Sequence, residues 1–298
     1  MNRKLKEIDE LLEGLNRSVG GHYRWLVQAF RLIAKRNANP NDISSLGAHS
    51  GCQFGIWLNK YLNTETEDKG FLLAINEKHI YVHDVCRQLI DSVLQDNLQE
   101  SLFNDFERAL QEFVAAITCY QTHLLQLRIS YDALTSLPLR RILDESFAQQ
   151  VMDRSNGDLY VMIMDIDHFK RINDSYGHMV GDEVLRAFAQ KLQSATRHYE
   201  PVYRYGGEEF IVILKAINEA EAMSAGLRIT RAIESHEIRV GHYVIPVTVT
   251  SGLTRAIPGE LLRLVLERAD GAMYVGKQSG RNRCMYINAE GSIERVQN

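Results

Sequence analysis

In the first half of the chain, apolar residues recur every three to four positions, which is the spacing of amphipathic helices. This pattern predicts four helical segments: residues 5–33, a shorter stretch after Gly51 as far as Tyr61, about 68–95, and about 98–129. The turn residues Asn37–Asn41, with Pro40 among them, are expected to end the first segment. Four helices joined by short loops predict an antiparallel four-helix bundle over residues 1–129.

The second half, residues 130–298, mixes short apolar runs with helical segments. Asp158–Met164 predicts a buried strand, and two apolar runs around Gly206 and Gly207 predict a hairpin, because glycine adopts positive φ at little cost. Tyr243–Thr250 predicts another strand, in which Pro246 marks an edge or an irregularity. Helices are expected over residues 140–151, 181–196, 218–234 and 261–274. This order resembles the α+β sandwich of polymerase palms and nucleotide cyclases.

Composition narrows the class of protein. The 298 residues are 45% hydrophobic and carry a formal net charge of −4, which argues against a general nucleic-acid or anionic-membrane binder but leaves room for a local basic pocket. No apolar run approaches the roughly 18 residues of a membrane span, and no signal peptide is evident, so a cytoplasmic protein is expected. Cys119 and Cys284 are expected to be buried thiols without a special role.

Three histidines and one cysteine stand out in the helical half. His79 and His83 are four positions apart, so both imidazoles leave one face of a helix, as in helices that supply two ligands to one metal. His22 lies in an apolar stripe, and Cys52 stands at a helix start. Together they would complete a closed tetrahedral zinc site. Alternatively, each histidine is a separately hydrogen-bonded core residue. The spare candidate ligands are His49 and Cys86.

Acidic residues gather around the predicted hairpin. Glu208 and Glu209 directly follow its two glycines, at the start of a strand that should be buried. Neighbouring carboxylates repel each other and strands disfavour glutamate, so a divalent cation is expected to offset the cost. Asp165 ends the buried strand abruptly and is expected to meet the hairpin acids. The alternative is a solvated hairpin tip with two surface acids.

The segment 167–182 is dense in charged and polar residues and is expected to form a loop that leads into a helix. Lys170 and Arg171 are suited to phosphate. Asn173 and Asp182 together offer the donors and acceptors that one guanine edge requires. Two further cations, Lys277 and Arg281, lie near the end of the last predicted helix, where they would also complement the helix dipole.

Two family resemblances follow from these motifs. His22 with Trp25, Cys52-Gln53-Phe54-Gly55-Ile56-Trp57 and His79-Ile80-Tyr81-Val82-His83 resemble the chemoreceptor zinc-binding domain family, a small four-helix bundle with a three-histidine, one-cysteine zinc site. Asp132-Ala133-Leu134-Thr135, the motif from Asp165 to Asp182, Arg204 to Phe210, and Lys277 with Gly280-Arg281-Asn282 resemble the GGDEF diguanylate cyclase family. The chain as a whole resembles zinc-sensing diguanylate cyclases.

The cyclase resemblance implies that two GTP molecules condense to cyclic di-GMP and two pyrophosphates in a homodimer. The implied ligands of Mg²⁺ or Mn²⁺ are Asp165, the Ile166 carbonyl, Glu208 and Glu209. Glu208 is implied to activate the ribose 3′-hydroxyl, and Lys170 to stabilise charge on the reacting phosphates. The implied substrate-binding residues are Asn173 and Asp182 at guanine, His178 beside the substrate, and Lys277 and Arg281 at the β- and γ-phosphates.

Regulation is implied at two further places. The zinc ligands map onto His22, Cys52, His79 and His83, and zinc there is expected to inhibit the cyclase. The family's product-inhibition motif, Arg-x-x-Asp, corresponds to Arg197 and Glu200. Glutamate replaces aspartate here, so the side chain that carries the carboxylate is one methylene longer. The competing hypothesis is a catalytically silent receptor for GTP or cyclic di-GMP, but degenerate members of the family usually lose acids that this chain keeps.

Overall fold

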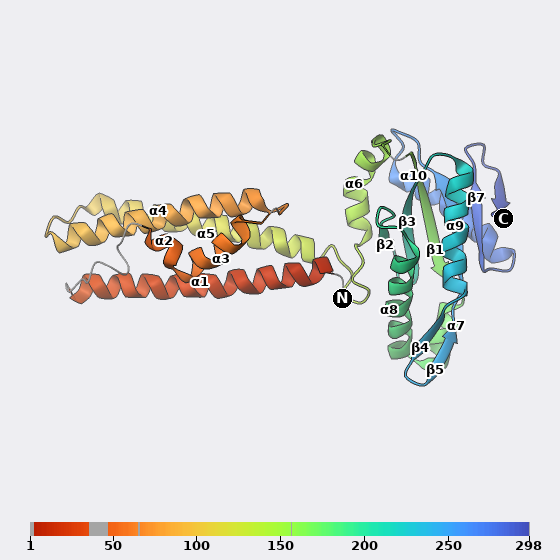
Figure 1. The fold of residues 1–298 in the computed structure, drawn as a ribbon, viewed down its shortest axis with the longest axis horizontal. Coiled ribbons are helices and arrows are strands. Elements are labelled where there is room, and N and C mark those ends of the chain that lie inside the picture. The colour runs from red at the N-terminus through yellow and green to blue at the C-terminus, as the bar shows by residue number, and fades with distance from the viewer. Residues whose placement is uncertain (1–2, 36–46, 65, 156, 298) are drawn as a thin grey trace. The chain divides into compact units, whose positions relative to one another are not determined.

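The computed structural model describes residues 3–35, 47–64, 66–155 and 157–297, so the turn expected at Asn37–Asn41 lies outside the described residues. The chain divides into two compact units, residues 3–129 and residues 130–298 (Figure 1). Each unit has its own hydrophobic core and is described separately below.

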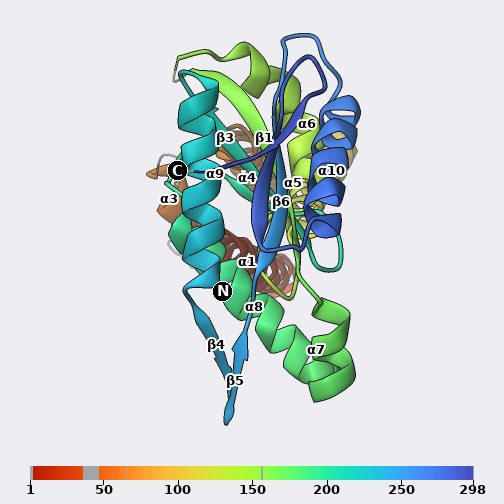
Figure 2. The same ribbon diagram turned by 90° about the vertical axis from the view of Figure 1, so that its right-hand side faces the viewer.

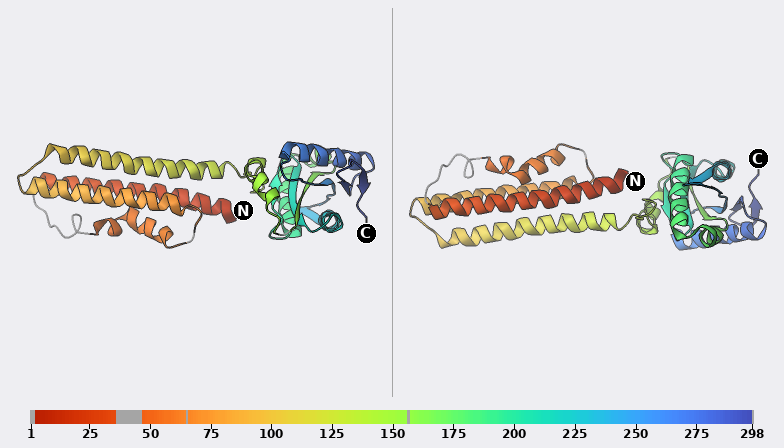
Figure 3. Two further views of the ribbon diagram at one scale, coloured as in Figure 1. Left: turned by 90° about the horizontal axis from the view of Figure 1, so that it is seen from above. Right: turned by 90° about the horizontal axis from the view of Figure 1, so that it is seen from below.

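The N-terminal unit is a helical bundle. Its long helices are α1 (Arg3–Lys35), α4 (Lys69–Leu94) and α5 (Glu100–Arg128), which run side by side in both views of Figure 3. The shorter α3 (Gln53–Leu62) packs against α1 and α4. Leu15, Phe54 and Tyr120 are among its fully buried side chains, as the helical spacing requires. The four-residue helix α2 (Ala48–Gly51) was not predicted, and Cys119, expected to be buried, is exposed on α5.

The second unit is built on a six-stranded sheet with the strand order β2-β3-β1-β6-β7-β8. Neighbouring strands are antiparallel, except that β6 and β7 are parallel. The strands are β1 (Asp158–Ile166), β2 (Val202–Arg204), β3 (Glu209–Ala216), β6 (Val249–Arg255), β7 (Arg283–Ile287) and β8 (Ile293–Arg295). The central strand β1 is buried on both faces from Leu159 to Met164, which explains its continuous apolar sequence.

Helices cover both faces of this sheet (Figure 2). Met162 and Met164 pack with α7 (Phe169–Tyr176), α8 (His178–Ala195) and α9 (Glu219–Glu234). Val161 and Ile163 pack with α6 (Arg140–Met152) and α10 (Leu262–Gln278). Because side chains alternate along a strand, Asp165 belongs to the face that α6 and α10 cover. The predicted α+β sandwich is therefore confirmed.

Parts of the second unit differ from the sequence prediction. The segment predicted as a loop before Gly181 contains α7, and α8 begins already at His178. Tyr243–Thr250 is not one strand: β5 (Tyr243–Pro246) pairs with β4 (Glu237–Val240) in a separate two-stranded sheet, and β6 begins at Val249. Pro246 ends β5, since proline has no N–H to donate to a continuing ladder. Strands β4, β7 and β8 were not predicted.

Candidate active site and metal centre

Strand register brings the predicted acids together at one end of β1. Asp165 lies directly opposite Glu209 of β3, and residues opposite each other in an antiparallel pair share a face of the sheet. Glu208 precedes β3, and its carbonyl accepts a hydrogen bond from the Ile166 N–H at 3.3 Å. The Lys277 ammonium, near the end of α10, pairs with Asp165 at 2.9 Å. The carboxylates therefore meet, as expected from the sequence, and Lys277 lies beside them, which the sequence did not predict.

The electrostatics of this cluster favour a cation. Burial raises the pKa of Asp165, Glu208 and Glu209 above the ordinary values. The charge of Asp165 adds to the rise in both glutamates, while Lys277 opposes it. A group of half-buried like charges is stabilised by a bound cation. A donor set made only of carboxylate and carbonyl oxygens suits Mg²⁺ or Mn²⁺, so the residues fit the expected metal.

Arg204 holds the hairpin that carries these glutamates. Its guanidinium donates to the carbonyl oxygens of Gly206 and Gly207 at 3.2 and 2.7 Å, and to the Asp132 carboxylate at 2.6 Å. A Cβ atom on Gly206 would lie 2.8 Å from a carboxylate oxygen of Glu209, so a larger residue there would displace that carboxylate. The hairpin at Gly206 and Gly207 is therefore held by Arg204 at its backbone and by the close packing of Gly206 against the Glu209 side chain.

Asp167 is a positioning residue that the sequence did not reveal. It is buried, and its carboxylate accepts hydrogen bonds from the hydroxyls of Thr248 and Thr250 at 2.7 and 2.6 Å. It also accepts the Asn282 N–H at 3.0 Å. Residues 280–282 all have positive φ, which costs energy at Arg281 and Asn282. Asp167 therefore holds a strained turn that carries Arg281. Two features of the sequence could have indicated this role of Asp167. It is the second acid of Asp165-Ile166-Asp167, and Thr248 and Thr250 alternate in the segment that pairs with that strand.

The predicted guanine-binding residues come together at the junction of α7 and α8. A Cβ atom on Gly181 would lie 1.9 Å from the Asn173 side-chain oxygen, so the amide rests directly on the backbone of α8, next to Asp182. Asp182 and His178 are exposed on the first turns of α8, and Lys170 is exposed on α7. Within the described residues, neither Lys170 nor His178 forms an ion pair with the carboxylate cluster.

The predicted product-inhibition residues lie in the turn before β2. Glu200 is 3% exposed, and Arg228 contacts its two carboxylate oxygens at 2.8 and 2.9 Å. The Glu200 carboxylate also accepts the Arg197 N–H at 2.6 Å, whereas the Arg197 guanidinium lies outside and contacts the Tyr199 hydroxyl at 2.6 Å. The carboxylate therefore already has partners, and the arginine remains accessible.

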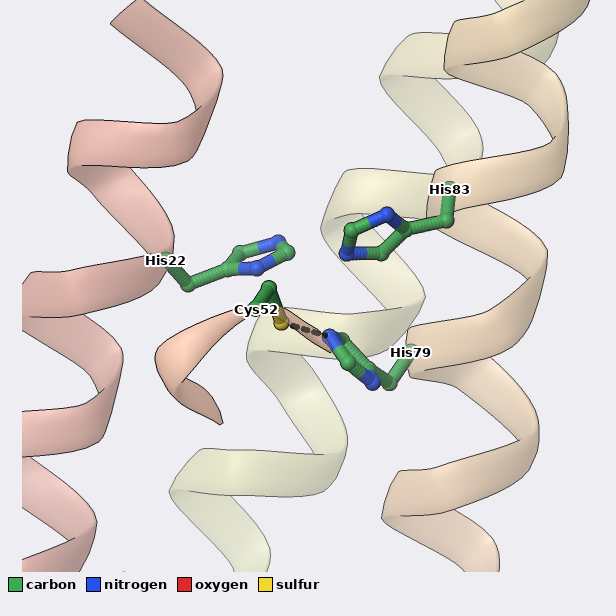
Figure 4. Close-up of side chains that lie close together, drawn as sticks. All are labelled: His22, Cys52, His79 and His83. Atoms are coloured by element: carbon green, nitrogen blue, oxygen red, sulfur yellow. Dashed lines mark hydrogen bonds between the residues drawn. The ribbon is translucent and has the colours of Figure 1, made fainter. Parts of the chain in front are cut away.

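The N-terminal unit contains a second cluster, with metal-ligating side chains. His22, Cys52, His79 and His83 each offer a ligand atom, and these atoms lie within 4.8 Å of one another (Figure 4). The three imidazole centroids are 5.1, 5.4 and 4.7 Å apart. Rings bound tetrahedrally to zinc at about 2.0–2.1 Å per nitrogen have centroids about 5 Å apart. The spacing therefore fits one zinc ion.

Among the described residues, the imidazoles of this cluster have no hydrogen-bond partner outside the cluster. Both ring nitrogens of His22 and His83, and Nδ1 of His79, are buried without a hydrogen bond. Burial lowers the pKa of His22 to about 4, of His83 to about 3 and of His79 to about 2, so all three are neutral at pH 7. Buried nitrogens left unpaired destabilise a fold, and neutral imidazole is the form that binds metal. The alternative of separately hydrogen-bonded histidines is not supported.

The start of α3 positions Cys52 in this cluster. Cys52 caps α3, and its sulfur accepts the Gly55 N–H at 3.2 Å while lying 3.2 Å from Nε2 of His79. A Cβ atom on Gly55 would lie 1.8 Å from the His49 carbonyl oxygen, so only glycine allows α2 and α3 to meet this closely. Of the spare candidates, Cys86 is buried outside the cluster, and the His49 ring lies beside it.

Comparison with known proteins decides the family. A family model described as "Diguanylate cyclase, GGDEF domain" matches residues 129–283. The chain belongs to the GGDEF diguanylate cyclase family. It is 43% identical over 296 residues to diguanylate cyclase DgcZ of Escherichia coli K12, which covers 99% of this chain and 100% of that protein. Diguanylate cyclase VdcA of Vibrio cholerae is 38% identical over 52% of this chain and 46% of its own length.

A solved structure supports the same family. The coiled coil and GGDEF domain of DgcB from Caulobacter crescentus, determined in complex with c-di-GMP, shares 30% identity and superposes with a TM-score of 0.51. The match covers 60% of this chain and 98% of that one. The protein is therefore a diguanylate cyclase with a helical N-terminal unit. In the part of the chain that the structure describes, no helix is long and apolar enough to span a membrane.

Proposed function

We propose that this diguanylate cyclase works as a homodimer and is inhibited by zinc bound in its N-terminal unit. The reaction would join two GTP molecules into cyclic di-GMP with release of two pyrophosphates. The observation that carries the proposal is the presence of an acidic cluster in the cyclase unit together with a buried His₃Cys cluster in the bundle, most of whose imidazole nitrogens have no hydrogen-bond partner among the described residues.

The acidic cluster is proposed to hold the catalytic metal. Asp165, the Ile166 carbonyl, Glu208 and Glu209 would be its ligands. A bound Mg²⁺ or Mn²⁺ would neutralise charge at the α-phosphate and acidify the attacking 3′-hydroxyl. Glu208 is proposed to accept the proton of that hydroxyl.

Cations around the cluster are proposed to hold the triphosphate. Lys277 already lies at 2.9 Å from Asp165, so its ammonium borders the site where phosphate would bind. The strained turn held by Asp167 directs Arg281 from the same end of α10, and both residues are proposed to bind the β- and γ-phosphates. Lys170, exposed on α7, is proposed to stabilise the charge that develops on the reacting phosphates.

The junction of α7 and α8 is proposed to recognise guanine. The Asn173 amide would pair with O6 and N7, and the Asp182 carboxylate would accept from N1–H and the 2-amino group. The contact of Asn173 with Gly181 supports this assignment, because it sets the amide next to Asp182. His178 is proposed to lie beside the bound nucleotide.

The homodimer follows from the symmetry of the product. Each acidic cluster would hold one GTP, and cyclic di-GMP is made from two, so two chains must bring their sites face to face. The bundle offers a surface for this contact. Phe103, Val114 and Leu125 are spaced by eleven residues on one face of α5 and are 45%, 46% and 51% exposed. Exposed apolar side chains in such a row favour contact with a second copy.

Zinc is proposed to act by fixing the bundle. The four ligands come from α1, from the start of α3 and from α4, so one ion would cross-link three helices. Phe113 of α5 packs against His22, with ring centroids 4.8 Å apart. Bound zinc would therefore also restrain α5, the helix that precedes the cyclase unit in the sequence. Restraining this helix is proposed to keep the two cyclase units from meeting.

Arg197 and Glu200 are proposed to bind the product and so inhibit the enzyme. The accessible Arg197 guanidinium would contact a phosphate of cyclic di-GMP, and the product would have to compete with Arg228 for the Glu200 carboxylate. The ion pair between Arg228 and Glu200 would therefore weaken product binding at this site.

One assay separates an active cyclase from a silent receptor for the same nucleotides. Purified protein is stripped of zinc with a chelator, the chelator is removed, and GTP and Mg²⁺ are added. We expect an active cyclase to form cyclic di-GMP and to release two pyrophosphates for each cyclic di-GMP. Nucleotide binding without any product would support the receptor instead.

A further inference from the structure

The His₃Cys cluster is closed to water. His22, Cys52, His79 and His83 are 2%, 8%, 0% and 6% exposed. A zinc ion that arrives from solvent carries bound waters and must exchange them for buried donors one at a time. Zinc tolerates a fifth ligand at some sites. A further donor between the solvent and the cluster would therefore speed both uptake and release.

His49 occupies such a position. Its side chain is half-exposed, and its ring centroid lies 6.4 Å from that of His79 and 6.3 Å from that of His83. These separations exceed the 4.7–5.4 Å found among the three ligand rings. His49 is therefore too far away to be a permanent ligand, but close enough that rotation of its side chain would bring a nitrogen to the ion.

The backbone of His49 is anchored, whereas its ring makes only edge contacts with the rings of His79 and His83. The Cys52 thiol contacts the His49 carbonyl at 3.3 Å, and the Cys52 N–H bonds to the Ala48 carbonyl at 3.1 Å. The close approach of Gly55 fixes the same carbonyl from α3. Among the residues that the structure describes, none forms a hydrogen bond with the His49 ring. The backbone thus holds His49 at the edge of the cluster, and no hydrogen bond from the described residues fixes its imidazole.

We propose that His49 is the exchange ligand through which zinc enters and leaves the His22–Cys52–His79–His83 cluster. The inference rests on the proposed binding of zinc to that cluster. In the exchange, a nitrogen of His49 binds the ion while one of its waters leaves, and the ion then passes to a buried ligand. Release follows the same steps in reverse, so His49 speeds both directions and leaves the equilibrium unchanged.

The test measures zinc uptake and release in the full-length protein, with fluorescence as the readout. The Trp25 ring contacts the His83 ring, with centroids 3.8 Å apart and planes tilted by 32°, so its emission should report metal binding. Uptake is followed by mixing metal-free protein with limiting zinc in a stopped-flow instrument. Release is followed by mixing zinc-loaded protein with excess chelator.

We expect His49→Ala to slow uptake and release alike, by the same several-fold factor. Their ratio, and hence the affinity, should stay the same. His49→Asp keeps a donor at this position and should restore most of the rate. The matched control is His123→Gln, because His123 is a half-exposed histidine of the same unit, paired with Asp68 at 3.1 Å. It should leave both rates unchanged.

Two outcomes would overturn the inference. Unchanged rates of zinc uptake and release in His49→Ala would mean that His49 takes no part in the exchange. Faster release with weaker binding would make it a permanent ligand. A wild-type protein that binds no zinc by elemental analysis would instead refute the proposed zinc site itself, and this is established before any rate is measured.

Discussion

The guanidinium of Arg204 donates to the Asp132 carboxylate at 2.6 Å while it holds the carbonyls of Gly206 and Gly207. The same carboxylate accepts the N–H and the hydroxyl of Thr135 at 2.7 and 2.6 Å. One ion pair thus joins the turn at the start of the cyclase unit to the hairpin that carries Glu208. A change in this turn would reach the acidic cluster through two side chains.

Asp132→Asn should therefore weaken both the fold and the reaction. The side chains of Arg204 and Asp132 are 12% and 19% exposed, so losing the charge should lower the free energy of unfolding by about 1–3 kcal/mol. The rate constant kcat should fall more than KM rises, because the hairpin loosens while the phosphate-binding residues stay. Urea unfolding and initial rates measure both. Asp144→Asn, which removes a more exposed partner of Arg140, is the control.

The pH dependence of stability checks the same pair. Burial pushes the pKa of Asp132 up, but hydrogen bonds from Thr135 and Arg204 outweigh it and hold the pKa below its usual value. A carboxyl with a depressed pKa stabilises the fold above its unfolded pKa and loses this effect as the pH falls below about 4. The difference in stability between wild type and Asp132→Asn should therefore shrink on acidification from pH 5 to about 3. A constant difference would contradict the assignment.

Asp167→Asn tests the strained turn at residues 280–282. An amide can still accept hydrogen bonds from two of the three donors, but it cannot replace the carboxylate at Thr248, Thr250 and Asn282 together. Arg281 should lose its orientation, so KM for GTP should rise by about tenfold or more, with a smaller change in kcat. Steady-state kinetics decides this. Thr254→Val, which removes a buried hydroxyl from β6 without touching Asp167, serves as the control for a general loss of packing.

Glu208→Gln should abolish turnover and leave GTP binding in place. Glutamine has nearly the same volume but cannot accept the proton of the 3′-hydroxyl, and a loss of about 100-fold to 10,000-fold is typical for such a base. Calorimetry measures GTP binding, and chromatography measures cyclic di-GMP. Glu290→Gln, in an exposed turn, should behave as the wild type. Turnover retained by Glu208→Gln would remove this residue from its proposed role.

Gly55→Ala should weaken zinc binding although no ligand is changed. The added Cβ would lie 1.8 Å from the His49 carbonyl oxygen, so α2 must move away from α3, and Cys52 between them moves too. We expect affinity to fall by about 10- to 100-fold. Gly51→Ala is the matched control, since a Cβ there would meet nothing within 4 Å. Equal zinc affinity in wild type and Gly55→Ala would mean that the close approach does not position the thiolate.

The sequence predicted the acidic cluster because its members carry local signals. Glu208 and Glu209 are adjacent at a glycine turn, and Asp165 ends an apolar run abruptly. The role of Asp167 could not be predicted in the same way, since its partners Thr248, Thr250 and Asn282 are remote in the sequence. Helix α7 was missed because its eight residues are mostly polar and bury only Phe169 and Ile172.

The sequence likewise predicted only part of the His₃Cys cluster. The four-residue spacing of His79 and His83 indicated a shared helix face, and that face is present in α4. The spacing could not choose between Cys52, Cys86 and His49, because a residue three positions past His83 also points toward that side of the helix. Only the distances exclude Cys86 and set His49 outside the ligand set. Periodicity thus predicts faces, and tertiary packing selects ligands.

The central claim is that zinc in the bundle controls the cyclase. The most direct measurement is the rate of cyclic di-GMP formation during a zinc titration of metal-free protein, with bound zinc determined in the same samples. We predict that the rate falls as the first equivalent binds, and that Cys52→Ala neither binds this equivalent tightly nor responds, while Cys86→Ala behaves as the wild type. Equal rates for the zinc-free and zinc-bound protein would contradict it.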